Sequence, residues 1–225
     1  MYVPATSTPA APVAPLAPIE LASGGVSSGA ARLTGLAGSP ASAEAHASLI
    51  VGHEQLNVLA GHASTIAGSL RPGLAGQRVR LQALTKHGWS TLTSTLTGRN
   101  GRFRVRYVPG RPGSRPVRLS FVGDALALPA HRRLGRLNVF RLAEASWYGG
   151  GGGLACGGEL TGSTIGVANK TLPCGTLLTL RYDGRSLQVR VIDRGPYVEG
   201  REFDLTEATK RALGFGGVGE VWSTR

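Results

Sequence analysis

Hydrophobic and polar residues alternate with a period of two in the middle of the chain. The segments concerned are residues 77–84, 102–107 and 116–121. In the second segment Phe103, Val105 and Tyr107 share one face and the other face is all arginine. Such alternation predicts antiparallel strands with one buried and one solvated face. The dipeptide Asn100-Gly101 lies between strand-like runs, so we expect a β-hairpin with a type I′ turn there.

The sequence of the last third of the chain also predicts strands, together with one helix. Asp183-Gly184 stands between TLLTLRY and RSLQVRVID, which predicts a second β-hairpin. Thr206 is a candidate N-cap for a short helix through TEATKRAL, and Gly214 stands where the helix would end. The five consecutive glycines at 149–153 are too flexible for a strand interior.

Residues 1–45 are rich in Pro, Ala, Ser and Gly and show no periodicity. Such a segment buries too little apolar surface to fold, so we expect a disordered tether. It would act as a wall-spanning spacer or be the remnant of a trimmed leader, since no recognisable signal peptide stands at its start. The predicted organisation is this tether, a basic β-sandwich over 46–140 and a mainly β domain over 144–225.

Positive charge is concentrated in one part of the chain. The net charge is +12, and residues 61–140 hold 14 Lys and Arg against Asp124 alone. A basic sheet face predicts binding to anionic wall polymers such as teichoic acid, to acidic peptide stems or to anionic lipid. A solvated face without a ligand is the alternative. Nucleic acid is not expected, because no aromatic residues are placed for base stacking. No apolar run is long enough to predict a transmembrane helix.

The stretch GQRVRLQALTKHGWSTLTSTLTGRNGRFRVRYVPG, which contains the strand-like alternation and Trp89, resembles bacterial immunoglobulin-like modules of cell-surface proteins. The resemblance implies an immunoglobulin-like β-sandwich over 46–140.

Cys156 and Cys174 are the two cysteines of the chain. No Cys/His cluster has metal-ligand spacing, so neither a metal nor another cofactor is expected. A single pair in a small glycine-rich region predicts one disulfide and an oxidising compartment, with two unrelated buried thiols as the alternative.

The run VIDRGPYVEGREFDLT carries the candidate chemistry. Asp193 ends a strand at the Gly195-Pro196 turn, where a carboxylate would be held rigidly and half exposed. Arg194 and Arg201 are close in sequence, and we expect them to face substrate or the nearby acids Asp204 and Glu199. An ordinary turn-forming aspartate is the alternative for Asp193.

Four segments, ASWYG, VANKTLPCGTLLTL, VRVIDRGPYVEGREFDLT and ALGFGGVGEV, resemble in order and spacing the rare-lipoprotein-A-like (RlpA-like) family. The resemblance implies a six-stranded double-psi β-barrel with a short helix over about the last 80 residues. It also implies binding of peptidoglycan glycan strands and, in some members, lytic transglycosylase activity.

The family's motifs carry over to individual residues. Asp193 matches the aspartate of DRGP, and Glu159 lies near the family's acid in the preceding loop. These two are the candidate catalytic residues. Where the family commonly has histidine this chain has Asn169, whose amide can orient a sugar hydroxyl but cannot shuttle a proton. The predicted substrate-binding residues are Asn169, Lys170, Thr171, Arg194, Tyr197, Arg201 and Asp204.

A lytic transglycosylase needs a single carboxyl group. It protonates the glycosidic oxygen and then takes the proton of the muramyl C6 hydroxyl as an anhydro ring closes. No water has to be positioned, so the paired carboxylates of glycosidases are not required. We therefore expect a secreted, wall-associated lytic transglycosylase. An expansin-like module that binds or loosens wall polysaccharide without cleaving it is the alternative.

Overall fold

The computed structural model describes residues 46–225. The tether predicted for residues 1–45 lies outside them. Among the described residues, no helix combines the length and the apolarity needed to cross a membrane.

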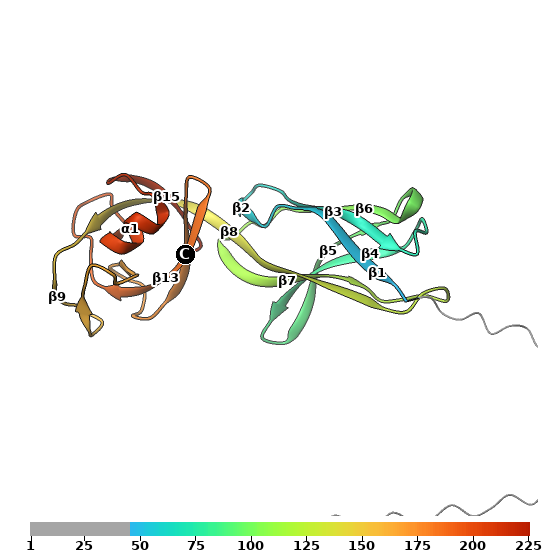
Figure 1. Cartoon of the computed structure of the whole chain (residues 1–225), viewed down its shortest axis with the longest axis horizontal. Helices are drawn as coiled ribbons and strands as arrows, with labels where there is room; N and C mark the ends of the chain where they lie inside the picture. The colour runs from blue at the N-terminus through green and yellow to red at the C-terminus, as the bar shows by residue number, and fades with distance from the viewer. Residues whose placement is uncertain (1–45) are drawn as a thin grey trace, which may run out of the picture. The chain divides into compact units, whose positions relative to one another are not determined.

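Strands dominate the N-terminal part of the described chain (Figure 1). They are β1 (Ser48–Glu54), β2 (Asn57–Leu59), β3 (Ser64–Arg71), β4 (Arg78–Thr85), β5 (Gly88–Leu96), β6 (Arg102–Tyr107), β7 (Gly113–Phe121) and β8 (Ala130–Tyr148). One sheet has the order β1-β3-β6, and the other joins β5, β4, β7 and β8 in that order, with β2 added along β8. The chain thus builds two sheets from these strands.

The two sheets enclose one hydrophobic core. Its members include Ile66 of β3, Leu81 of β4 and Val105 of β6, all fully buried. The alternation in 102–107 is confirmed, because Phe103 and Val105 are buried while the arginines of this strand are exposed.

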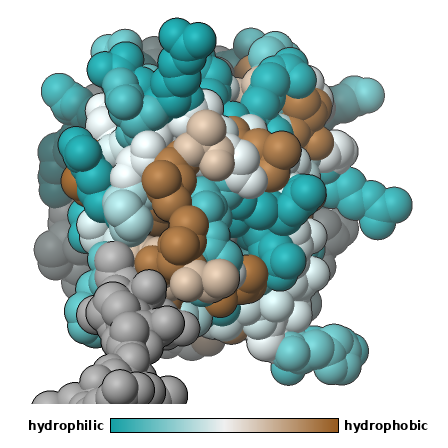
Figure 2. All heavy atoms as spheres, turned by 90° about the vertical axis from the view of Figure 1, so that its right-hand side faces the viewer, coloured by the Kyte–Doolittle hydropathy of each residue, from teal (hydrophilic) through white to brown (hydrophobic). Residues whose placement is uncertain are grey.

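Figure 2 shows one end of the molecule, where hydrophilic residues cover most of the face and hydrophobic atoms are exposed between them.

The hairpin predicted at Asn100-Gly101 is wrong. Strand β5 pairs with β4, and β6 pairs with β3 in the other sheet, so the short 3₁₀ turn η1 (Arg99–Gly101) crosses between sheets. Both turn residues do adopt positive φ, 59° and 68°. A Cβ on Gly101 would collide with the carbonyl oxygen of Leu70, so the turn packs closely against β3. The backbone of the turn is as expected, but burial of β6 in the core decides its partner strand.

Strand β8 contributes to both halves of the described chain. Its residues up to Phe140 pair with β7 and β2, and those from Arg141 onward pair with β15 (Gly219–Ser223). The boundary predicted between 140 and 144 therefore falls at a change of strand partner within one strand, without a loop. The division into separate domains there stays a prediction.

Six strands form a closed barrel in the C-terminal part. The further elements here are β9 (Gly152–Gly153), β10 (Glu159–Leu160), β11 (Val167–Ala168), β12 (Leu177–Tyr182), β13 (Arg185–Asp193), β14 (Phe203–Thr206) and the helix α1 (Glu207–Leu213). The order is β14-β11-β13-β12-β15-β8, and a parallel pairing of β14 with β8 closes the ring. Apolar side chains fill it, among them Val191, Phe203 and Leu205. The fold is mainly β with a six-stranded barrel and one short helix, as predicted.

Local signals in this part are confirmed. Strands β12 and β13 form the hairpin expected at Asp183-Gly184, where both residues have positive φ. Thr206 caps α1 by accepting a hydrogen bond from the Thr209 N–H, and Gly214 ends the helix in the left-handed region. The helix packs on β13 and β14 (Figure 1).

Candidate functional site

Asp193 is the last residue of β13, and its carboxylate is held by backbone. Its Oδ1 accepts hydrogen bonds of 2.9 Å from the N–H groups of Ala155 and Arg194. Within the described residues no hydrogen bond engages its Oδ2. The side chain is partly exposed, so one carboxylate oxygen is fixed and the other is available to a ligand.

Asp204 lies in β14, in parallel register with Ser146 of β8. The Ser146 Oγ donates a 2.7 Å hydrogen bond to its Oδ1. Burial raises the pKa of the Asp204 carboxyl above the ordinary value, and the negative charge of Asp193 raises it further. The Ser146 hydrogen bond and the charge of Arg201 act in the opposite direction. The carboxylate of Asp193 thus lies close enough to act on the charge of Asp204.

Tyr148 completes this cluster. It follows Ser146 by two residues on β8 and therefore shares its face of the strand. Its hydroxyl oxygen is buried, and within residues 46–225 no partner meets the distance and angle of a full hydrogen bond. Burial raises the pKa of the phenol, and the charge of Asp193, a weak hydrogen bond to the Asp193 side chain and the charge of Asp204 raise it further, so it remains protonated. A buried donor that makes no full hydrogen bond beside two carboxyl groups is a group available to a substrate oxygen.

Sequence reasoning missed Tyr148 and Ser146 and gave Asp204 only a substrate-binding role. The signal for the first two was present in the segment ASWYG, since residues two apart on a strand share a face. The proximity of Asp204 to Asp193 could not be read from the chain, because it depends on β14 and β13 joining the same closed barrel.

Asn169 has a structural role that the sequence did not indicate. The residue is 3% exposed. Its Oδ1 accepts the N–H groups of Thr171 (3.0 Å) and Leu172 (2.8 Å), and its Nδ2 donates to the carbonyl oxygen of Glu202 at 3.0 Å. The amide holds the backbone of the 169–172 turn in place. The expectation that it orients a sugar hydroxyl is not supported by this geometry.

Arg194 also binds backbone rather than facing substrate or the acids Asp204 and Glu199. Its guanidinium donates to the carbonyl oxygens of Asn169 (2.9 Å) and Leu172 (2.8 Å). A third contact of 3.1 Å reaches the sulfur of Cys174. The expected orientation was wrong because these unpaired loop carbonyls lie beside the end of β13 and attract the guanidinium. Arg194 thus connects the Asp193 strand to the neighbouring loop.

The disulfide between Cys156 and Cys174 is confirmed. It joins the loop that contains Ala155 to the turn held by Asn169 and Arg194. Cys156 also donates its N–H to the carbonyl oxygen of Ile192, next to Asp193. Cross-link and hydrogen bonds therefore fix the backbone on both sides of the Asp193 carboxylate.

The remaining predicted residues are more exposed. Glu159 lies on β10 with an exposed side chain, and within residues 46–225 no hydrogen bond or ion pair engages its carboxylate. Lys170 and Thr171 are exposed, and Tyr197 is 81% exposed. Of the predicted set, Asp193 and Arg201 lie close enough for their charges to act on Asp204, and the charges of Glu159 and Lys170 do not act on it.

Comparison with known proteins finds relatives of the barrel. A family model described as "Lytic transglycolase" matches residues 142–222. A probable endolytic peptidoglycan transglycosylase RlpA of Synechocystis is 38% identical over 112 residues, which cover 43% of this chain and 35% of that protein. The protein of the same description from Aquifex aeolicus is 44% identical over 75 residues, covering 31% and 33%.

An endolytic peptidoglycan transglycosylase RlpA of Neisseria meningitidis serogroup A is 40% identical over 77 residues, 32% of either chain. Among solved structures, the Streptomyces papain inhibitor aligns with 22% identity and a TM-score of 0.31, covering 37% of this chain and 91% of its own. The chain spans about a third of the length of these curated relatives. Residues 142–222, which form the six-stranded barrel, thus match the lytic transglycolase family model and are similar to RlpA proteins.

Proposed function

We propose that the barrel cleaves peptidoglycan glycan strands as a lytic transglycosylase, with Asp204 as the acid. The observation that carries this is the raised pKa of Asp204, half-buried near Asp193, within the part of the chain that matches lytic transglycolases. A general acid has to hold a proton near neutral pH, and burial next to a second carboxylate is a common way to achieve this.

Asp193 and Tyr148 take supporting roles in this proposal. Asp193 keeps one oxygen on the backbone, and its other oxygen faces the positive charge that develops on the sugar ring. The Tyr148 hydroxyl, buried near Asp193 and without a full hydrogen bond in the described part of the chain, donates to a substrate oxygen. The assignment of the acid thus moves from Asp193, which the sequence favoured, to Asp204.

The reaction needs no water. The Asp204 carboxyl gives its proton to the glycosidic oxygen, and the bond from that oxygen to C1 of the muramyl sugar breaks. The muramyl C6 hydroxyl oxygen then bonds to C1, and its proton returns to the Asp204 carboxylate. The products are a free hydroxyl on one fragment and a 1,6-anhydro end on the other, and the acid is regenerated.

Digestion of purified peptidoglycan, with mass spectrometry of the products, tests the proposal. Wild-type protein is expected to produce anhydro-muramyl ends, and Asp204→Asn is expected to lower their yield by at least a hundredfold. Asp183→Asn is the matched control, since it makes the same change in a hairpin turn where asparagine tolerates positive φ. Wild-type yields in Asp204→Asn would refute Asp204 as the acid, and hydrolytic ends instead of anhydro ends would refute the reaction type.

An expansin-like module that binds wall polysaccharide without cleaving it is the second candidate. The commitment of Asn169 to backbone, where the family commonly has histidine, favours it. The same assay discriminates, because such a module retains peptidoglycan binding and produces no anhydro ends. Loss of cleavage in Asp204→Asn with binding retained would exclude it.

We also propose that the N-terminal region, which we infer to be immunoglobulin-like, binds anionic wall polymers outside the cell. The exposed side chains of Arg102, Arg104 and Arg106 support this, and the disulfide supports an oxidising compartment. Retention on cell walls should fall steeply with salt. Replacing the three arginines together by serine should also weaken it, and unchanged or salt-insensitive retention would contradict the proposal.

A further inference from the structure

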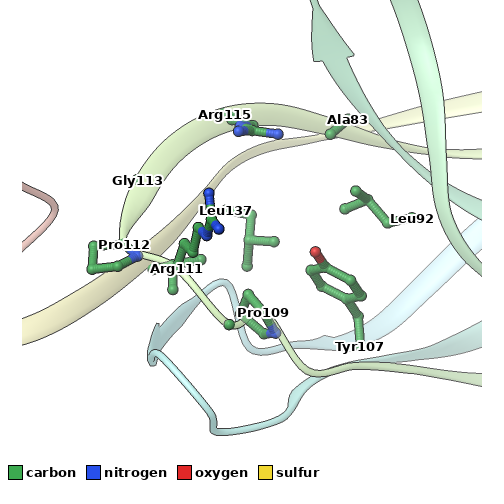
Figure 3. Close-up of a pocket in the computed structure, with 11 residues that line it drawn as sticks. Ala83, Leu92, Tyr107, Pro109, Arg111, Pro112, Gly113, Arg115 and Leu137 are labelled. Atoms are coloured by element: carbon green, nitrogen blue, oxygen red, sulfur yellow. The ribbon is translucent and has the colours of Figure 1, made fainter.

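A cavity of about 240 Å³ opens between the two N-terminal sheets, where residues 108–112 connect β6 to β7 (Figure 3). Strands of both sheets contribute to its wall. The apolar residues that line it are Ala83, Leu92, Pro109, Leu137 and Val139. It belongs to a different part of the chain from the Asp193 and Asp204 cluster, and the proposed reaction makes no use of it.

Three polar side chains face this space. Figure 3 shows the hydroxyl of Tyr107 and the guanidinium of Arg111 directed toward the cavity, with Arg115 at its edge. No carboxylate lines it. The ion pairs found within residues 46–225 are Arg141 with Glu202 and Arg211 with Glu207, so neither cavity arginine has an acidic partner there. No hydrogen bond in that range engages these guanidinium groups or the Tyr107 hydroxyl.

These groups define the chemistry of a ligand. Two guanidinium groups without acidic partners favour an anion, and guanidinium binds carboxylates well because its paired N–H donors match the two oxygens. The apolar wall favours a small apolar body beside the charge. Since a water molecule takes about 30 Å³ in the liquid, the volume corresponds to roughly eight waters. A ligand of that size has on the order of ten non-hydrogen atoms, which is two small amino-acid residues.

We propose that this cavity binds the carboxyl-terminal end of a short peptide with small apolar side chains. The terminal carboxylate lies against Arg111 and Arg115, the Tyr107 hydroxyl donates to a carboxylate or carbonyl oxygen, and two methyl-sized side chains contact Leu92 and Leu137. A neutral sugar would leave both guanidinium groups without a counter-charge. A bare inorganic anion would leave the apolar wall without a partner.

Titration calorimetry with the full chain tests the proposal, using N-acetyl-Ala-Ala in its D,D and L,L forms as probes. At least one form is expected to bind, and the form preferred indicates whether the natural peptide is of wall or protein type. The amidated version of the bound form should bind at least tenfold more weakly, because it lacks the charge that the arginines recognise. Failure of both forms, or equal binding of acid and amide, would overturn the proposal.

Variants locate the site. Arg111→Gln with Arg115→Gln should weaken binding at least tenfold, and Tyr107→Phe should weaken it less. Arg132→Gln, which removes an exposed arginine from the same region but not from this cavity, is the matched control and should bind as wild type does. A double variant that binds as tightly as the control would refute the cavity. The soluble probes contain no glycan, so a barrel that forms no anhydro ends leaves this test unaffected.

Discussion

The backbone N–H of Ala155 donates a 2.9 Å hydrogen bond to Oδ1 of Asp193, across 38 residues of sequence. Ala155 directly precedes Cys156, whose disulfide to Cys174 fixes the same loop. The disulfide therefore helps to fix the position of the Asp193 carboxylate, although it involves neither Asp193 nor the proposed glycan substrate. Four predictions follow from this site.

Opening the disulfide should lower both stability and activity. The cysteines are 18 residues apart, so the cross-link stabilises the fold by about 3 kcal/mol on the loop-closure model. Cys156→Ser with Cys174→Ser should lose about that amount in chemical denaturation. At a temperature where the variant is still folded, its yield of anhydro ends should also fall, because the Ala155 N–H is held less firmly. Full activity in the folded variant would show that the loop holds its position without the cross-link.

Tyr148→Phe should separate activity from stability. The change removes a buried hydroxyl that makes no full hydrogen bond with any of residues 46–225, so the free energy of unfolding should stay the same or rise by up to about 1 kcal/mol. Cleavage should fall at least tenfold, since the substrate loses a donor. Thermal unfolding and product analysis are measured on the same sample. Tyr182→Phe, at a barrel tyrosine packed edge-on against Phe215, is the control and should leave cleavage unchanged.

Asp204→Asn should stabilise the protein at neutral pH. Because burial raises the pKa of Asp204 in the folded state, the folded protein binds more protons than the unfolded chain between the ordinary and the raised pKa. The stability of the wild type therefore falls as pH rises through this window. Asparagine removes the buried charge and can still accept from Ser146. The gain should be below about 1 kcal/mol, because the carboxylate is only half-buried and water screens it.

The pH dependence of unfolding checks this prediction. The difference between Asp204→Asn and wild type should shrink toward zero as the pH falls below the ordinary aspartate pKa of about 3.9. A variant less stable than wild type at pH 7 would mean that the Ser146 hydrogen bond and Arg201 outweigh burial.

Asn169→His should damage the fold rather than restore activity. Where the family commonly has histidine, this chain has an amide that cannot shuttle a proton. In the structure the Asn169 amide accepts two N–H groups and donates to a carbonyl oxygen, and a neutral imidazole has one acceptor and one donor nitrogen. At least one buried backbone group would lose its partner, at a cost of about 1–3 kcal/mol. Thermal unfolding measures the loss, and increased cleavage by a stable variant would contradict the structural reading.

Turns and helix caps, which depend on neighbouring residues, were predictable from the sequence. The pairing of strands that lie far apart in the sequence was less predictable. The Asp183-Gly184 hairpin and the Thr206 cap depend on residues close in sequence, and both were found. The Asn100-Gly101 turn also has its expected backbone, but its strands belong to different sheets, because the core rather than the turn selects the partner of β6.

The same distinction applies to the site. Asp193 could be located from the DRGP motif. The raised pKa of Asp204 arises mainly from burial, with a smaller part from the carboxylate of Asp193, eleven residues away in sequence, which the closed barrel brings near it. The roles of Asn169 and Arg194 depend on the orientation of backbone carbonyl and N–H groups in loops. The pattern of side chains along the sequence does not predict that orientation.

The alternating arginines of β6 have a consequence for solubility. In the order β1-β3-β6 this strand is the edge of its sheet, and an edge strand offers unpaired backbone groups to other molecules. A second copy that paired there in antiparallel register would bring arginine side chains opposite arginine side chains, and like charges across strands repel. The charges that we propose for polymer binding thus also guard against edge-to-edge aggregation, and their removal should promote self-association in sedimentation experiments.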